Sequence, residues 1–169
     1  MSAITQPLRD EHRQLLVRLE ALRETADAAG YAPSAAFAAM VEEALDFLSY
    51  HLLPHARAEE AFLYPAVARV LGAPRGTATM SRDHVEVERL ARELRALRPA
   101  HPDDDLDVAK LRALRQVLYG LYAVVQLHFA KEEEVYLPLL DAGLGPEEAQ
   151  VLFERMEATA ASEKRAAPV

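Results

Sequence analysis

Two stretches of the chain decide how the rest is interpreted: HARAEEAFLYP, residues 55–65, and HFAKEEEVYLP, residues 128–138. In each, a glutamate follows the histidine by four residues, a second glutamate comes directly after it, and a proline ends the string. Side chains four residues apart lie on one face of an α-helix, so each string predicts a histidine and a glutamate that point the same way. Either both strings are ordinary helix surfaces, or each string is half of one site.

The composition is that of a globular protein, with 51% hydrophobic and 27% charged residues in a chain of 169. We expect a single domain over residues 1–169. There is no cysteine, which excludes disulfides and thiolate metal sites. The net charge of −8 argues against nucleic acid as a partner. Neither a membrane span nor the apolar core of a signal peptide is present, so we expect a soluble, cytoplasmic protein.

Apolar residues with a helical period fall in five segments, separated by short connectors that contain proline or glycine. No run alternates like a strand. We therefore predict an all-α fold, an antiparallel up-down-up-down four-helix bundle over about residues 7–140, with a short fifth helix at about 146–159. The alternative is an irregular α-helical array. The expected bundle helices span about residues 7–29, 34–71, 81–97 and 106–140.

Histidine and glutamate occur on the stripes that these helices must bury. His55 and Glu59 share a stripe with Leu48, and His128 and Glu132 share one with Leu121. A buried carboxylate is costly unless it is paired or binds a cation. The second glutamates, Glu60 and Glu133, turn about 100° away from the stripes, and we expect them to be solvated.

The first and third helices add His12, on the face of Leu8 and Leu15, and the pair His84 and Glu88. His12 precedes His55 by 43 residues, and His84 precedes His128 by 44. Each half of the chain thus forms one copy of the same helical hairpin. An approximate two-fold axis between the two hairpins would bring the four histidines to one level. Four imidazoles and three carboxylates are too many ligands for one ion but suit two first-row metal ions bridged by carboxylates.

Several other residues invite a role. We interpret His51, one turn before His55, as a core or supporting histidine rather than a ligand, and we expect Tyr50, Tyr119 and Tyr122 to pack. Pro54 either kinks the second helix near the site or marks a restart of the helix. The acidic run PDDDLD, residues 102–107, lacks regular calcium-ligand spacing and is expected to be a solvated loop and helix start.

At these residues the sequence resembles the hemerythrin-like (HHE cation-binding) domain family, over about residues 8–140, and the endings EEAFLYP and EEEVYLP strengthen the resemblance. The resemblance implies a bundle around two iron ions with an oxo or hydroxo bridge; manganese and zinc stay open as alternatives. The metal ligands that it implies are His12 and His55 on one iron, His84, Glu88 and His128 on the other, and Glu59 and Glu132 as bridges.

The chain departs from the oxygen-carrying members in two ways. Glu88 stands where they have a histidine, and Glu132 lies four residues after His128, where they have an aspartate at five. Extra carboxylate stabilises ferric iron, which puts reversible oxygen carriage in doubt. The position opposite Glu88 is Leu16, which cannot bind metal. We therefore expect the open coordination position on the iron of His12 and His55.

The resulting expectation is a non-heme di-iron protein that binds oxygen, nitric oxide or peroxide for sensing, storage or detoxification. The first alternative is a peroxidase-like, catalase-like or oxygen-reducing enzyme at the same centre. The second is a metal-free helical interaction domain. The sequence predicts no membrane contact and names no protein partner.

Overall fold

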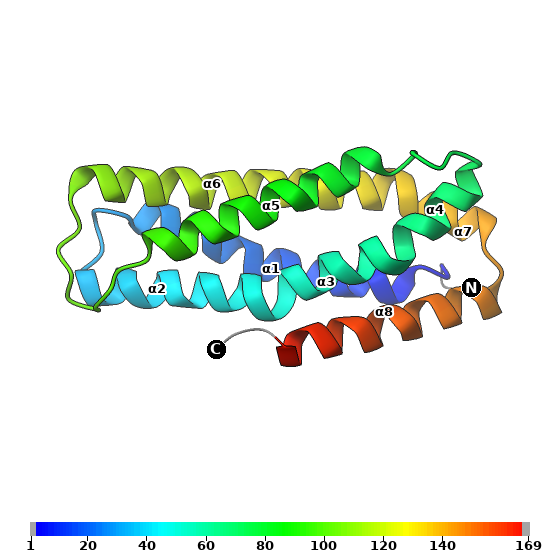
Figure 1. The fold of residues 1–169 in the computed structure, drawn as a ribbon, viewed down its shortest axis with the longest axis horizontal. Coiled ribbons are helices and arrows are strands. Elements are labelled where there is room, and N and C mark those ends of the chain that lie inside the picture. Colours follow the sequence, from blue (N-terminus) through cyan, green and yellow to red (C-terminus); the bar gives the residue numbers. More distant parts are fainter. Residues whose placement is uncertain (1–2, 167–169) are drawn as a thin grey trace.

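The computed structural model describes residues 3–166, and it contains helices and no strands within that range. Figure 1 shows long helical rods that lie side by side. The predicted all-helical class is confirmed. The helices are α1 (Gln6–Ala28), α2 (Ser34–Phe47), α3 (Leu53–Ala58), α4 (Tyr64–Leu71), α5 (Ala78–Leu97), α6 (Val108–Lys131), α7 (Leu137–Gly143) and α8 (Pro146–Ala166).

Short π-helical turns join some of these helices into continuous rods. They are η1 (Leu48–Leu52), η2 (Glu59–Leu63) and η3 (Glu132–Tyr136), so the second rod runs from α2 to α4 and the fourth from α6 to α7. Each turn ends two residues before a proline, namely Pro54, Pro65 and Pro138. Proline lacks the N–H that would bond to the carbonyl four residues back, and a π turn accommodates that loss.

The rods therefore stay continuous where proline would otherwise break them. The backbone stays helical from η1 into α3, so the helix does not restart at Pro54. Figure 1 shows the second rod bending between α3 and α4, close to η2 and Pro65. The rod ends at Gly72, which has a φ of +63°, the left-handed conformation that glycine adopts without strain.

Buried apolar residues form two separate clusters along the length of the rods. One cluster fills the part that contains α2 and the first half of α6, and includes Leu19, Leu48 and Leu121. The other includes Leu63 and Leu140 and extends under α8. Along each rod, the buried histidines and glutamates lie in the region where residues of one cluster are followed by residues of the other. A polar layer thus divides the hydrophobic core.

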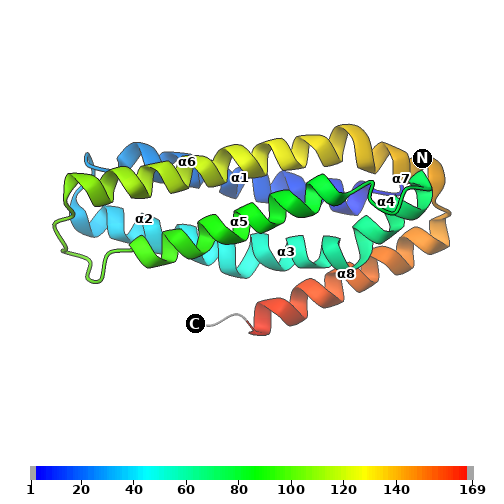
Figure 2. The same cartoon turned by 45° about the horizontal axis from the view of Figure 1, so that its top comes forward.

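The fifth helix is longer than predicted: it continues to Ala166 instead of ending near residue 159. Figure 2 shows α8 running back along the outside of the rods, beside α3 and α4. Leu152 and Met156 bury their side chains there, and Ala160 packs against the same cluster. An ion pair between Glu163 and Arg57 of α3 extends the contact, which explains why the tail stays helical.

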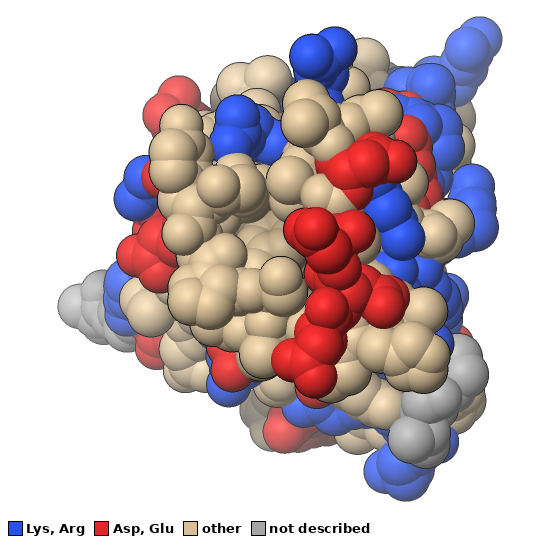
Figure 3. Space-filling view, turned by 90° about the vertical axis from the view of Figure 1, so that its left-hand side faces the viewer, with Lys and Arg blue, Asp and Glu red and all other residues tan. Residues whose placement is uncertain are grey.

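The acidic connector between α5 and α6 is structural, as expected. Figure 3 views the end of the molecule that carries this connector, and acidic side chains form a band across it. Asp104 accepts hydrogen bonds from the N–H groups of Ala100 and His101, and Asp107 caps α6 by accepting from the N–H of Lys110. These carboxylates therefore stabilise a turn and a helix start. No helix within residues 3–166 has the length and apolarity to cross a bilayer.

Asp141 ties the start of α1 to the end of the fourth rod. Its carboxylate accepts from the N–H and hydroxyl of the buried Thr5, at 2.9 and 3.1 Å, and from Arg9 at 3.2 Å. Partial burial would by itself raise the pKa of Asp141, but these hydrogen bonds and the Arg9 charge outweigh it and lower the pKa.

Replacing Asp141 by alanine should lower the free energy of unfolding by about 1–3 kcal/mol, because it leaves the buried Thr5 N–H without this acceptor. Since the folded pKa lies below the unfolded value of about 3.9, the stabilisation is present above that pH and is lost as pH falls through the folded pKa. Urea unfolding of both proteins from pH 7 to pH 3 measures this. Asp103→Ala, in the exposed connector, is the control; equal stability of the Asp141 variant at pH 7 would refute the role.

Candidate metal centre

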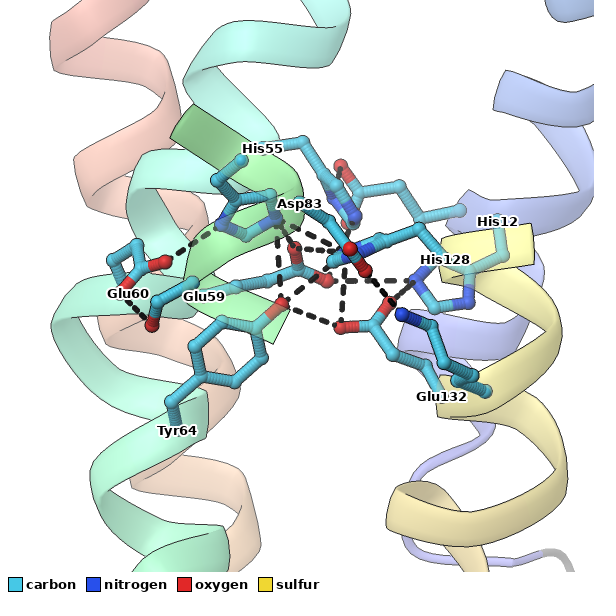
Figure 4. Close-up of polar contacts among 12 residues, drawn as sticks. His12, His55, Glu59, Glu60, Tyr64, Asp83, His128 and Glu132 are labelled. Carbon is cyan, nitrogen blue, oxygen red and sulfur yellow. Dashed lines mark hydrogen bonds and ion pairs between the residues drawn. The ribbon is translucent and has the colours of Figure 1, made fainter. Parts of the chain in front are cut away.

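The polar layer consists of one histidine from each of α1, α3, α5 and α6, with one glutamate from each of η2 and η3. Figure 4 labels five of these six side chains, those from α1, α3, α6, η2 and η3, and shows them pointing toward one another between the rods. Glu59 and Glu132 are fully buried, with 0% exposed surface, and the four histidines are buried as well. The six residues are His12, His55, Glu59, His84, His128 and Glu132. The structure thus brings together six of the seven side chains that the sequence predicted as ligands.

Glu59 divides its two oxygens between two pairs of histidines. Oε1 lies 2.9 Å from Nε2 of His55 and 3.6 Å from Nε2 of His12. Oε2 lies 3.3 Å from Nε2 of His84 and 3.8 Å from Nε2 of His128. One carboxylate therefore faces both halves of the layer.

Glu132 repeats this division. Its Oε2 is 3.4 Å from Nε2 of His12, and its Oε1 is 3.4 Å from Nε2 of His128. The ligand atoms form two compact groups, which share Glu59. The first group is His12, His55, Glu59 and Glu132; the second is Glu59, His84 and His128.

Several atoms at the centre of the layer have no hydrogen-bond partner although they are buried. They are both oxygens of Glu59, Oε2 of Glu132, and Nε2 of His12 and of His55. Unsatisfied buried polar atoms cost free energy, and charged ones cost the most. All of these atoms are good ligands for first-row transition metals, so the donor set fits metal ions between the two histidine pairs.

Each imidazole turns its outer nitrogen, Nδ1, toward an acidic side chain. The partners are Glu133 for His12 (2.8 Å), Glu11 for His55 (3.2 Å), Glu60 for His84 (2.8 Å) and Asp83 for His128 (3.1 Å). An ionised carboxylate only accepts hydrogen bonds, so Nδ1 carries the proton and Nε2 is left free to face the interior. This is the arrangement that orients metal-binding histidines and increases their basicity.

The acid–histidine pairs follow the internal repeat. Glu11 and Asp83 each come one residue before the histidine of the first helix of a hairpin, and each contacts the second helix of the same hairpin. Glu60 and Glu133 each follow a buried glutamate and contact the histidine of the other hairpin. Glu60 and Glu133 are in contact with solvent, as expected, but the sequence did not predict that each also supports a histidine. They are 39% and 30% exposed, yet each also reaches across to a neighbouring rod.

Without metal ions, protons on histidine side chains supply the positive charge of the layer. Burial lowers the pKa of His55, but the carboxylates of Glu59 and Glu11 outweigh it and raise the pKa well above its usual value. Burial likewise lowers the pKa of His128, but Glu132 and Glu59 hold it at about 10. Burial would raise the pKa of Glu59, but the histidines keep it well below its usual value. The carboxylates thus attract positive charge.

Glu88, the seventh predicted ligand, lies outside both groups, and this expectation needs correction. Its side chain is 42% exposed and faces Arg57, at 4.0 Å. The buried stripe of α5, which includes Met80, His84 and Val87, drifts around the helix as heptad positions do. At about 100° per residue, Glu88 lies about 90° from the centre of that stripe.

Tyr64 is a residue of the layer that the sequence analysis missed. Its hydroxyl donates to Oε1 of Glu132 at 2.9 Å and lies 3.3 and 3.2 Å from Nε2 of His84 and His128. Burial, and next the charge of Glu59, raise the pKa of Tyr64, so it stays a donor in the metal-free protein. By α-helical geometry Tyr64 would point away from Glu59, but the π turn η2 aligns residues five apart.

The remaining candidates do not join the layer. His51 stacks on Phe47, is half-buried, and lies in neither ligand group. Tyr119 and Tyr122 donate to Asp27 and Glu20 at the surface of α1. Phe129 stacks on His12, with ring centroids 4.5 Å apart, and so closes the layer toward the first apolar cluster.

Replacing Glu60 by alanine should weaken metal binding by about 10-fold to 100-fold, because His84 loses the carboxylate that fixes its ring and tautomer. Affinity is measured by competition with a coloured chelator. By the two-fold repeat, Glu133→Ala should have a similar effect through His12. The control is Glu134→Ala, an exposed glutamate of the same run. Equal affinities for all three variants and the parent chain would show that these carboxylates do not support the histidines.

The comparison with protein-family models agrees with this geometry. The model described as the hemerythrin HHE cation-binding domain matches residues 3–140, which includes all four rods up to the middle of α7. Comparisons with curated proteins and with solved structures found no match. Because the family match covers most of the chain and all six side chains of the buried layer, the protein belongs to the hemerythrin HHE cation-binding domain family.

Proposed function

We propose that the chain is a non-heme di-iron protein that binds a small ligand such as oxygen, nitric oxide or peroxide. The observation that carries the proposal is the pair of buried carboxylates whose opposite oxygens face different histidine pairs. In this proposal His12 and His55 hold one ion, His84 and His128 hold the other, and Glu59 and Glu132 bridge them. The four rods then form an antiparallel up-down-up-down bundle around the pair.

When bound, two iron ions would supply a site that takes up a small ligand and exchanges electrons with it. The protein's own residues have three tasks. The carboxylates neutralise the cations, and the acids at Nδ1 fix the imidazoles. The apolar clusters on both sides of the layer exclude bulk water and restrict the ligand to a small molecule.

A cavity of about 380 Å³ reaches His55 at one side of the layer. Its walls come from α1, the second rod and α8, and they include Leu15, His55, Met156 and Ala161. His55 belongs to the first ligand group, so a ligand that enters here meets the ion of His12 and His55. This supports the expectation that the open coordination position lies on that ion.

A peroxide-reducing or oxygen-reducing enzyme is the second candidate, and the abundance of carboxylate favours it. Two buried glutamates lie in the layer and four further acids contact its histidines. This negative charge stabilises ferric iron and lowers the reduction potential, which makes a lasting complex with oxygen harder to maintain. Mixing the ferrous protein with oxygen in a stopped-flow instrument separates the two. A stable adduct indicates binding, whereas immediate oxidation with sustained peroxide turnover indicates an enzyme.

Anaerobic loading with ferrous ions should give about two iron ions per chain, as expected for a carboxylate-bridged pair in a bundle core. Glu132→Ala should lose iron and lower the melting temperature of the loaded protein, because the remaining ligands do not neutralise two cations. Metal analysis and thermal unfolding measure both effects. His101→Ala, in the exposed connector, should change neither. Fewer than about one iron per chain, or an unchanged Glu132 variant, would favour a metal-free helical domain.

Narrowing the cavity should slow ligand binding without removing metal. In Ala161→Phe, a large ring projects from α8 into the cavity, so azide should bind the ferric protein several times more slowly at an unchanged iron content. The rate is followed by stopped-flow absorbance. Ala158→Phe adds the same ring at an exposed position of α8. If Ala161→Phe and Ala158→Phe bind azide equally fast, the ligand reaches the layer by another route.

A further inference from the structure

The two halves of the buried layer differ at the position five residues after each buried glutamate. In the second rod this residue is Tyr64, and in the fourth rod it is Leu137. Both stand directly after a π turn, and the N–H of each bonds to the carbonyl of the glutamate, Glu59 or Glu132. Both side chains are buried, Tyr64 at 3% and Leu137 at 0% exposure. The repeat therefore places a phenol in one half and a hydrocarbon in the other.

The phenol lies in the half whose compact group of ligand atoms comes from fewer residues. The first group contains four residues, whereas the second contains only Glu59, His84 and His128. Glu132, whose Oε1 lies 3.4 Å from Nε2 of His128, is the proposed second bridge, so without Glu88 each ion has two histidines and two glutamates. The Tyr64 oxygen lies 3.3 and 3.2 Å from Nε2 of His84 and His128. It is thus close to the inner nitrogen of both histidines in this group.

We propose that Tyr64 supplies an oxygen ligand to the metal ion held by Glu59, His84 and His128. This inference rests on the proposed di-iron function and deepens it. On metal binding the Tyr64 hydroxyl gives up the proton that it shares with Glu132, the proton passes to solvent, and the freed lone pair faces the ion. A buried negative oxygen is unfavourable by itself, but a bound cation beside it stabilises it. Ferric iron favours such an oxygen ligand.

This assignment also explains the asymmetry between the two ions. With Tyr64 and Glu132 added, the ion of His84 and His128 has more protein ligands than its neighbour. Leu137 offers no donor atom to the other half, so the ion of His12 and His55 keeps an open position, on the side that the 380 Å³ cavity reaches. One tyrosine therefore decides which ion takes the exogenous ligand.

The test is optical, because a tyrosine bound to ferric iron gives a charge-transfer band in visible light. The parent chain, loaded with iron and oxidised, should show this band, and resonance Raman excitation within it should enhance tyrosine ring vibrations that shift when tyrosine is ring-deuterated. Tyr64→Phe should lose the band and the vibrations while it keeps the helical content of the metal-free protein. The matched control is Tyr136→Phe, which removes a hydroxyl that donates to the carbonyl of Gly76, and it should keep both.

Each outcome bears on a definite claim. Two irons per chain with no tyrosine vibrations in the parent protein would overturn the role of Tyr64 and leave the di-iron proposal intact. A band that persists in Tyr64→Phe, or disappears in Tyr136→Phe, would also overturn it. Failure of the parent chain to bind iron would overturn the proposed function, and this inference with it. If the Tyr64 variant does not fold, the isotope shift in the parent protein decides whether a tyrosine is bound.

Discussion

Two carboxylates buried between two apolar clusters are the constraint on which the rest of the structure depends. Glu59 and Glu132 have no exposed surface, and three of their four oxygens lack a hydrogen-bond partner. Such groups are stable only with positive charge beside them. In the metal-free protein, protonated histidines provide that charge, as the raised pKa values of His55 and His128 indicate. In our account, two metal ions take over this task, and folding and metal binding stabilise each other.

The internal repeat explains how one chain builds this layer economically. Each hairpin contributes two histidines, one buried glutamate and two acids for Nδ1, so a single local pattern used twice satisfies both halves. Proline after each glutamate run leads to a π turn that keeps the rod continuous. The two hairpins differ at positions that make the two halves of the site chemically unequal. Tyr64 replaces the leucine of the other half, and α8 covers the second rod on the side where the cavity reaches His55.

Much of this architecture was predictable because it follows from helical periodicity. The rods and the pairing of His55 with Glu59 and of His128 with Glu132 need only a spacing of four. Helical periodicity alone did not predict side-chain positions that depend on neighbouring rods or on local backbone geometry. Glu88 is an equally good match by spacing, but the drifting stripe of α5 turns it toward Arg57. Glu60 and Glu133 reach histidines on other rods, Tyr64 depends on a π turn, and the length of α8 depends on its packing. An acidic residue precedes the first histidine of each hairpin and another follows each buried glutamate. Because this pattern recurs in both hairpins, it could have predicted the acids that contact the histidines.

The most direct test of the central claim is anomalous X-ray diffraction from crystals of the iron-loaded protein, recorded at the iron absorption edge. Our account predicts two peaks in each chain. One peak should lie among His12, His55, Glu59 and Glu132, and the other among Glu59, His84, His128 and Tyr64. A single peak, or density at the surface with an empty layer, would contradict the assignment of a carboxylate-bridged pair of ions to this buried site.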